Sequence, residues 1–248
     1  MKKIISSVLY RFGYSKKQTS NSFVDIQDEA FWEIFNACKP YTMTSVERMY
    51  ALYNSVNYVL DNNIQGDFVE CGVWRGGSSM LLALALKKRN ITDRKIYLFD
   101  TFEGMSEPTE NDVDLTGSDA DKLLNQTKHD KENSVWCLAS LEDVQANLNL
   151  TKYPAENIIY VKGKVEDTIP AKSPQSIALL RLDTDWYEST KHELIHLYPL
   201  LRSKGVMIID DYGHWAGCRK ATDEYFQEKE FKILLNRIDY TGRLMIKP

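Results

Sequence analysis

Short, uninterrupted apolar runs alternate with segments of helical periodicity from residue 67 to residue 228. Such runs are typical of parallel strands that are covered on both faces. The pattern predicts strands at Asp67–Cys71, Lys95–Asp100, Ile158–Lys162, Ile177–Leu182 and Val206–Asp210. It predicts helices at Ser78–Lys88, Leu141–Leu150, Thr190–Leu201 and Trp215–Glu228, the second opened by the capping box Ser140-x-x-Asp143. Strands that alternate with helices in this way indicate a doubly wound, mostly parallel α/β sheet.

Both ends of the chain add elements to this pattern. Before it, Glu29–Cys38 is a predicted helix ended by Pro40, and a second helix begins after Thr44 or Ser45. After it, Phe231–Asn236 and Leu244–Lys247 predict an antiparallel hairpin, which brings the sheet to seven strands. We therefore expect a helical extension over residues 1–40 and one domain over residues 41–248.

One connection is much longer than the others. About 40 residues, 101–140, separate the second predicted strand from the next helix, and Glu, Asp, Gly and Thr are frequent from Glu103 to Asp121. Connections in compact domains are usually far shorter. The segment is either a solvated insertion or a lid, and its place after the carboxyl end of a strand favours the lid.

Composition narrows the classes of partner. A net charge of −4 and a pI near 5.7 argue against nucleic acid as a partner. The four cysteines are far apart and form no C-x-x-C pair, so we expect neither a zinc knuckle nor a disulfide framework. We therefore expect a cytoplasmic protein with reduced thiols. Arg11 interrupts the N-terminal apolar run, so that run is too short for an export signal or a membrane span. It could form an amphipathic helix that packs on the domain, on a second subunit or weakly on a membrane surface, and we favour packing.

Four carboxylates follow two of the predicted strands. Asp183 and Asp185 come after Ile177–Leu182, and Asp210 and Asp211 close the run Val206–Asp210. Acidic side chains rarely leave a core at such points unless they meet water, an opposite charge or a metal, and ligands bind at the carboxyl ends of strands in open α/β sheets. The arrangement predicts a cation site. Ligation by oxygen alone favours Mg²⁺, Mn²⁺ or Ca²⁺ over zinc.

A second chemical signal surrounds the first predicted strand. That strand carries Glu70 and is followed by a turn containing Gly72, Gly76 and Gly77 and by a helix start, an order that suits an adenosyl cofactor. The glycine spacing, G-x-x-x-G-G, differs from the G-x-G-x-x-G of dinucleotide binders and disfavours a nicotinamide oxidoreductase. Asp100 ends the next strand, where a ribose diol would lie.

Five segments resemble the macrocin O-methyltransferase family. They are Tyr41–Thr44, Glu70–Gly77, Phe99–Met105, Leu182–Thr190 and Asp210–Gly213, and the similarity runs in the same order from about Pro40 to the C-terminus. The first 40 residues and the lid sequence lie outside it. The resemblance implies a class I, Rossmann-like methyltransferase fold. It also implies an enzyme that uses S-adenosyl-L-methionine and a divalent metal, usually Mg²⁺, to methylate sugar hydroxyls of glycosides.

The resemblance also implies roles for particular residues. Asp183, Asp210 and Asp211 correspond to the metal ligands of the family, and Asp185 to its proposed general base. The implied cofactor-contacting residues are Thr42, Met43, Glu70, Gly72, Ser78 and Asp100, with the adenine loop around Lys164 and Val165.

Histidines offer two further candidates. His192-Glu193-Leu194-Ile195-His196 matches the zinc motif H-E-x-x-H, but it falls in a helix between two parallel strands, so we expect two histidines and a glutamate on the solvent side instead. His214 follows the Asp210–Asp211 pair, and it either contacts substrate and assists proton transfer or is an ordinary loop histidine.

These observations favour a metal-dependent O-methyltransferase that acts on a small molecule or glycan with vicinal hydroxyls. A cation bound to both hydroxyls would lower the pKa of the reacting one while a nearby carboxylate takes its proton. A catechol-type phenolic O-methyltransferase and a non-catalytic adenosyl-ligand or glycan-binding module are the alternatives. We expect the protein to be a homo-oligomer, a dimer being the simplest.

Overall fold

The computed structural model describes residues 23–127, 129 and 136–248, and in these residues one sheet has the strand order β3-β2-β1-β4-β5-β7-β6. Five parallel strands are β1 (Asp67–Cys71), β2 (Ile96–Asp100), β3 (Ile158–Lys162), β4 (Ile177–Leu182) and β5 (Leu201–Ile209). β7 (Arg243–Ile246) is antiparallel to β5, and β6 (Asn236–Arg237) is antiparallel to β7. The predicted mostly parallel sheet with a C-terminal hairpin is confirmed.

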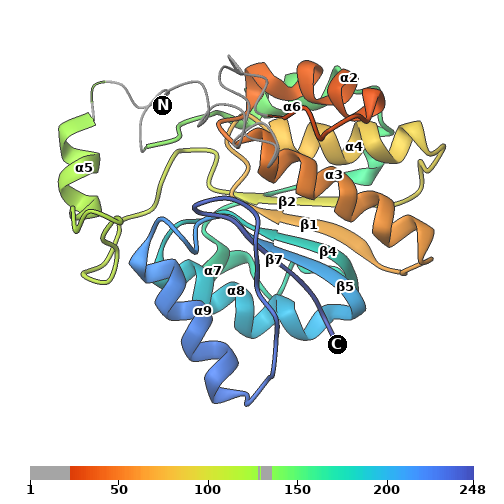
Figure 1. Cartoon of the computed structure of the whole chain (residues 1–248). Coiled ribbons are helices and arrows are strands. Elements are labelled where there is room, and N and C mark those ends of the chain that lie inside the picture. The colour runs from red at the N-terminus through yellow and green to blue at the C-terminus, as the bar shows by residue number, and fades with distance from the viewer. Residues whose placement is uncertain (1–22, 128, 130–135) are drawn as a thin grey trace, which may run out of the picture.

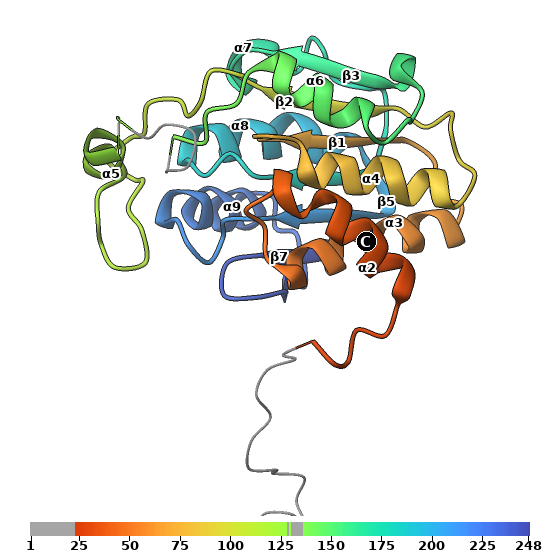
Figure 2. The ribbon, with the colours of Figure 1, turned by 90° about the horizontal axis from the view of Figure 1, so that it is seen from above.

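Helices cover both faces of this sheet (Figures 1 and 2). One face carries α2 (Glu29–Cys38), α3 (Val46–Asp61), α4 (Gly77–Lys88) and α6 (Leu141–Asn149). The other carries α7 (Val165–Thr168), α8 (Tyr187–Leu197) and α9 (Ala216–Glu228). Successive strand residues point to opposite faces, so Phe68 and Val69 of β1 belong to two separate apolar clusters. This double burial explains why apolar residues predominate on both faces of the central strands.

Several predicted boundaries were wrong, among them the starts of β5, predicted at Val206 and found at Leu201, and of α8, predicted at Thr190 and found at Tyr187. The helix predicted to reach Leu201 ends at Leu197, because a short 3-10 turn containing Pro199, which lacks an N–H donor, leads directly into a longer β5. The first hairpin strand is confined to Asn236–Arg237. The apolar alternation before it comes from Ile233 and Leu235, which pack on the core without pairing to a strand.

The N-terminal helices are fixed by caps and by burial. Asp28 accepts a hydrogen bond from the Phe31 amide at the start of α2, and Ser45, one of the two predicted caps, does the same for the Arg48 amide in α3. Phe31 is completely buried among aromatic neighbours, so α2 belongs to the same core as α3 and α4. The amphipathic helix expected near the N-terminus lies outside the described residues. The helices that are described include none with the length and apolar character that crossing a membrane requires.

The long connection between β2 and α6 is tied to the opposite face of the sheet. It contains a helix that the sequence did not predict, α5 (Ala120–Thr127), at the end of the molecule where the parallel strands finish (Figure 1). Asp112 is buried and accepts hydrogen bonds from the Tyr187 amide at the start of α8 (2.8 Å) and from Thr109. Val113 accepts a bond from the Ala216 amide. The segment is therefore anchored at its middle.

Strand register sets the position of the site. Glu70 of β1 lies beside Arg181 of β4, and Cys71 lies beside Leu182, which in turn lies beside Ile209 of β5. The three strands therefore end at one level, and the residues that follow them meet at one edge of the sheet.

Candidate active site

The four predicted aspartates meet at this edge. Asp183, Asp210 and Asp211 each offer a carboxylate oxygen, and these oxygens lie within 4.8 Å of one another. Asp185 lines the same cavity, together with all three. We call these four residues the aspartate cluster. Since like charges this close repel one another strongly, the cluster needs protons or cations to offset its charge.

Buried Arg181 and half-buried Arg48 offset part of that charge. Arg181, 2 % exposed, contacts Glu70 (Nη1 to Oε1, 2.5 Å), Asp183 (Nη2 to Oδ2, 2.7 Å) and Asp210 (Nη2 to Oδ1, 2.7 Å). Arg48 of α3 binds the other oxygen of Asp210 through Nη1, and its Nε lies 3.1 Å from Asp239. Both oxygens of Asp210 therefore have a cationic partner.

Asp211 and Asp185 are not compensated in this way. Burial first, and then the charges of Asp185 and Asp183, raise the pKa of Asp211 well above its usual range. Burial and the charge of Asp183 raise the pKa of Asp185 to about 7. Asp211 Oδ2 is buried and finds no hydrogen-bond partner among residues 23–127, 129 and 136–248. Hard oxygen donors with an unpaired buried oxygen fit a divalent cation such as Mg²⁺.

The glycine turn lies on the other side of the cavity. Gly72 has φ 81°, and a Cβ there would lie 1.9 Å from the Asp183 carbonyl oxygen, so only glycine fits between the two strand ends. Asp100 holds the turn, because Oδ2 accepts hydrogen bonds from the amides of Val73 (2.6 Å) and Trp74 (3.2 Å). Its Oδ1 accepts from Phe102 (2.7 Å). Burial raises the pKa of Asp100, and these backbone bonds oppose that rise.

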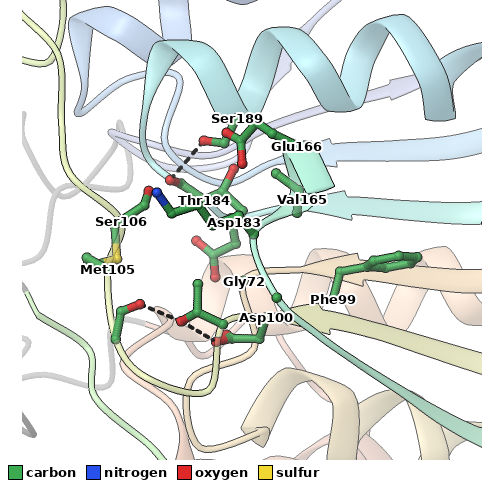
Figure 3. Close-up of a pocket in the computed structure, with 14 residues that line it drawn as sticks. Gly72, Phe99, Asp100, Met105, Ser106, Val165, Glu166, Asp183, Thr184 and Ser189 are labelled. Carbon is green, nitrogen blue, oxygen red and sulfur yellow. Dashed lines mark hydrogen bonds between the residues drawn. The ribbon is translucent and has the colours of Figure 1, made fainter. Parts of the chain in front are cut away.

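Two adjoining cavities connect the glycine turn with the aspartate cluster. Both are lined by Gly72, Asp100, Gly104, Met105 and Asp183, and the second is lined by residues of the glycine turn and by all four aspartates. Figure 3 shows the first, in which Asp183 and Asp100 approach from two different strands and Met105 and Ser106 of the long connection form the opposite wall. This first cavity also contains the predicted Lys164 and Val165, and the second contains Thr42, Met43 and Ser78.

Two predicted site residues do not line these cavities. Glu70 is fully buried and bonded to Arg181 and to the Ser79 hydroxyl. His214 also lies outside both cavities. Its ring centroid is 4.8 Å from that of Trp215 and 6.1 Å from that of Tyr240, and burial lowers its pKa. Its Nδ1 is buried and has no partner within the described part of the chain.

Comparison with known proteins identifies the family. A sequence model of the macrocin O-methyltransferases (TylF) matches residues 26–247. The chain belongs to this family. It is therefore an S-adenosylmethionine-dependent O-methyltransferase, as the five motifs predicted.

Named relatives agree with that conclusion. The chain is 32 % identical to 8-demethyl-8-(2,3-dimethoxy-alpha-L-rhamnosyl)-tetracenomycin-C 4'-O-methyltransferase of Streptomyces olivaceus, over 98 % of this chain and 88 % of that protein. It is 34 % identical to mycinamicin III 3''-O-methyltransferase of Micromonospora griseorubida, over 82 % and 76 %. The solved structure of the O-methyltransferase NovP superposes with a TM-score of 0.73 at 30 % identity, over 84 % of this chain and 82 % of NovP.

Sequence reasoning about this methyltransferase missed its arginines and misjudged Glu193. Glu193 was expected on the solvent side of its helix, but it is completely buried and accepts hydrogen bonds from Thr184. The expectation was wrong because this position of α8 faces the strand end that carries Thr184. Arg181 could have been suspected from its position alone, because it is a single arginine within the otherwise apolar strand β4.

Proposed function

We propose that this enzyme transfers the methyl group of S-adenosylmethionine to a sugar hydroxyl of a glycosylated small molecule, with the help of a divalent cation. The observation that carries the proposal is the unpaired Asp211 oxygen in an aspartate cluster that lines the same cavity as the glycine turn. The S. olivaceus relative is named for a rhamnosyl-bearing tetracenomycin, which supports a sugar as the acceptor.

The cofactor would lie along the first cavity and into the second. Asp100 would face the ribose, the loop carrying Lys164 and Val165 would border the adenine, and the amino end of α4 would face the carboxylate. Thr42, Met43, Gly72 and Ser78 would line the rest. Glu70 would not contact the cofactor. It would instead support the glycine turn, because its bond to Arg181 joins β1 to β4 next to that turn.

Asp183, Asp210 and Asp211 would hold the cation. Bound there, Mg²⁺ would orient two neighbouring hydroxyls and lower the pKa of the one that reacts. Asp185, which lines the cavity beside them, would accept that hydroxyl proton as the oxygen attacks the methyl carbon in line with the departing sulfur. The segment from Thr101 to Ser106, together with Cys137, would close the space from outside and exclude water.

Methyl transfer to a small acceptor panel tests this function. The panel is an L-rhamnoside with free neighbouring hydroxyls, its analogue with one of them removed, and catechol, each with S-adenosylmethionine and with either Mg²⁺ or EDTA. We expect methylation of the intact rhamnoside, loss with EDTA and recovery with Mg²⁺. If only catechol were methylated, the acceptor would be a phenol and not a sugar. If EDTA left the rate of transfer unchanged, the reaction would not require a cation.

A further inference from the structure

Glu193 is an acid in the interior of α8 that the proposed reaction does not use. Its side chain is 0 % exposed, and burial raises its pKa well above the usual range. The Thr184 hydroxyl donates to its carboxyl group, with distances of 3.0 Å to Oε1 and 3.2 Å to Oε2. The Cys71 thiol lies beside it. A buried acid that costs this much to bury needs a structural or functional reason.

The partner of Glu193 begins an unusual turn. The Trp186 amide donates to the Thr184 carbonyl at 2.7 Å, and Asp185 between them has φ 66°. A three-residue turn with a positive central φ is the rarer and more strained form of γ-turn. Residues in such conformations persist only where the surrounding structure holds them, and they cluster at functional sites.

Side-chain hydrogen bonds hold this turn from outside. Besides the Thr184 bond to Glu193, the Ser189 hydroxyl donates to the Thr184 carbonyl at 3.3 Å, a contact visible in Figure 3. The Trp186 indole donates to the Ser106 carbonyl at 3.0 Å. The central residue, Asp185, lines the cavity as one of the four acids of the aspartate cluster.

We propose that Glu193 is a positioning residue: by holding the Thr184 hydroxyl it keeps the turn strained and directs the Asp185 carboxylate at the reacting hydroxyl. Only the expected effect on turnover rests on the proposed function, because that effect assumes that Asp185 is the base. The hold on the turn follows from the contacts of Glu193 itself. The group acts as a hydrogen-bonding partner of fixed shape, so a neutral amide of the same size should replace it.

Four variants separate this role from general destabilisation. Glu193→Ala and Thr184→Val each remove one side of the bond and should lower kcat by about 10–100-fold. In Glu193→Ala, whose altered side chain lies outside both cavities, the Kd of S-adenosylhomocysteine should change less than about threefold. Glu193→Gln should keep kcat within about threefold of wild type. Leu197→Ala removes a buried side chain one turn further along α8, and should lower the melting temperature more than kcat. Normal kcat in Thr184→Val, or a Glu193→Gln variant as impaired as Glu193→Ala, would overturn the proposal even if Glu193→Ala failed to fold.

Two readouts tie the effect to Asp185 and to the turn. In an Asp185→Asn background, Glu193→Ala should cause little further loss of kcat, because the residue it positions is already disabled. Additive losses would contradict the proposal. Hydrogen exchange of a peptide spanning residues 183–188 needs no acceptor and should be faster in Glu193→Ala and Thr184→Val than in wild type. If wild type methylates no sugar, the proposed function fails, and unchanged exchange in these variants would separately refute the hold on the turn.

Discussion

The carboxylates on the two sides of the β1–β4 boundary have different partners. On the β1 and β2 side, Glu70 binds Arg181 and Ser79, and Asp100 binds three backbone amides. On the β4 and β5 side, Arg181 and Arg48 contact Asp183 and Asp210 but not Asp185 or Asp211, and one oxygen of Asp211 has no partner in the described chain. The first pair has its hydrogen-bonding capacity met by the protein, whereas the second group does not.

This difference separates the acids that support the structure of the site from the acids proposed to take part in the reaction. Acids whose oxygens are already satisfied fix the shape of the glycine turn and can add contacts to a cofactor hydroxyl. Acids held close together with raised pKa values, as at Asp185 and Asp211, are typical of groups that exchange protons or bind cations. The comparison predicts that substitutions on the β4 and β5 side affect turnover most, and those on the β1 and β2 side affect binding and the structure of the turn.

The largest effect is expected at Asp185. Replacing it by Asn keeps its size but removes the proton acceptor, so kcat should fall by roughly 10²–10⁴ while calorimetry shows unchanged binding of cofactor and Mg²⁺. Asp223→Asn is the matched control, because Asp223 lies outside both cavities and accepts a hydrogen bond from the Tyr212 hydroxyl at 2.8 Å. Near-normal turnover in Asp185→Asn would move the base elsewhere, and His214→Gln would then be the next variant to assay.

The next effect concerns stability and tests the shared arginine. Arg181→Met leaves three carboxylates without their buried partner, so the free energy of unfolding should fall by about 3–5 kcal/mol in urea titrations. Arg89→Met is the control, because it removes an exposed pair with Asp61 and should cost less than about 1 kcal/mol. Equal losses in the two variants would show that Arg181 does not offset the charge of the carboxylates around it.

Arg181 also marks the limit of what could be predicted from the sequence. Its partner Glu70 is 111 residues away, and the contact depends on the register of β1 against β4, which hydrophobicity alone does not specify. Arg48 approaches from α3, a helix whose packing angle the sequence leaves open. The compensation of charge in the site therefore became visible only in three dimensions.

The strands and the meeting of the four aspartates could be predicted. Unbroken apolar runs identified β1 to β5, and since parallel strands end at one edge, acids that follow β4 and β5 had to come together. The short helix α5 could not, because it lies in a polar stretch with few apolar positions. Glu193 was misplaced for a related reason, since helical periodicity shows which positions share a face but not which face meets a polar strand end.

A smaller effect should appear on the β1 and β2 side, at Asp100. Asp100→Ala removes the acceptor for three backbone amides and the group proposed to bind the ribose, so S-adenosylhomocysteine binding should weaken by about 1–3 kcal/mol in calorimetry. Glu103→Ala, at a side chain 72 % exposed in the following loop, should change binding by less than about 0.5 kcal/mol. If Asp100→Ala bound cofactor normally but lowered kcat as strongly as Asp185→Asn, the proposed division between support and chemistry would be reversed.

The smallest effect concerns the long connection, which joins the two sides. Met105 and Ser106 line the cavity, whereas Glu107, Glu110 and Leu115 are exposed. Proteases specific for glutamate or for large apolar residues should cleave the free protein between Glu103 and Asp121. Saturating cofactor should slow that cleavage by about twofold to tenfold if the segment closes over it. Asp112→Ala removes the buried anchor to α8 and should speed cleavage in both states. Equal cleavage with and without bound cofactor, in wild type and variant alike, would show that the segment is a surface insertion that does not close over the cavity.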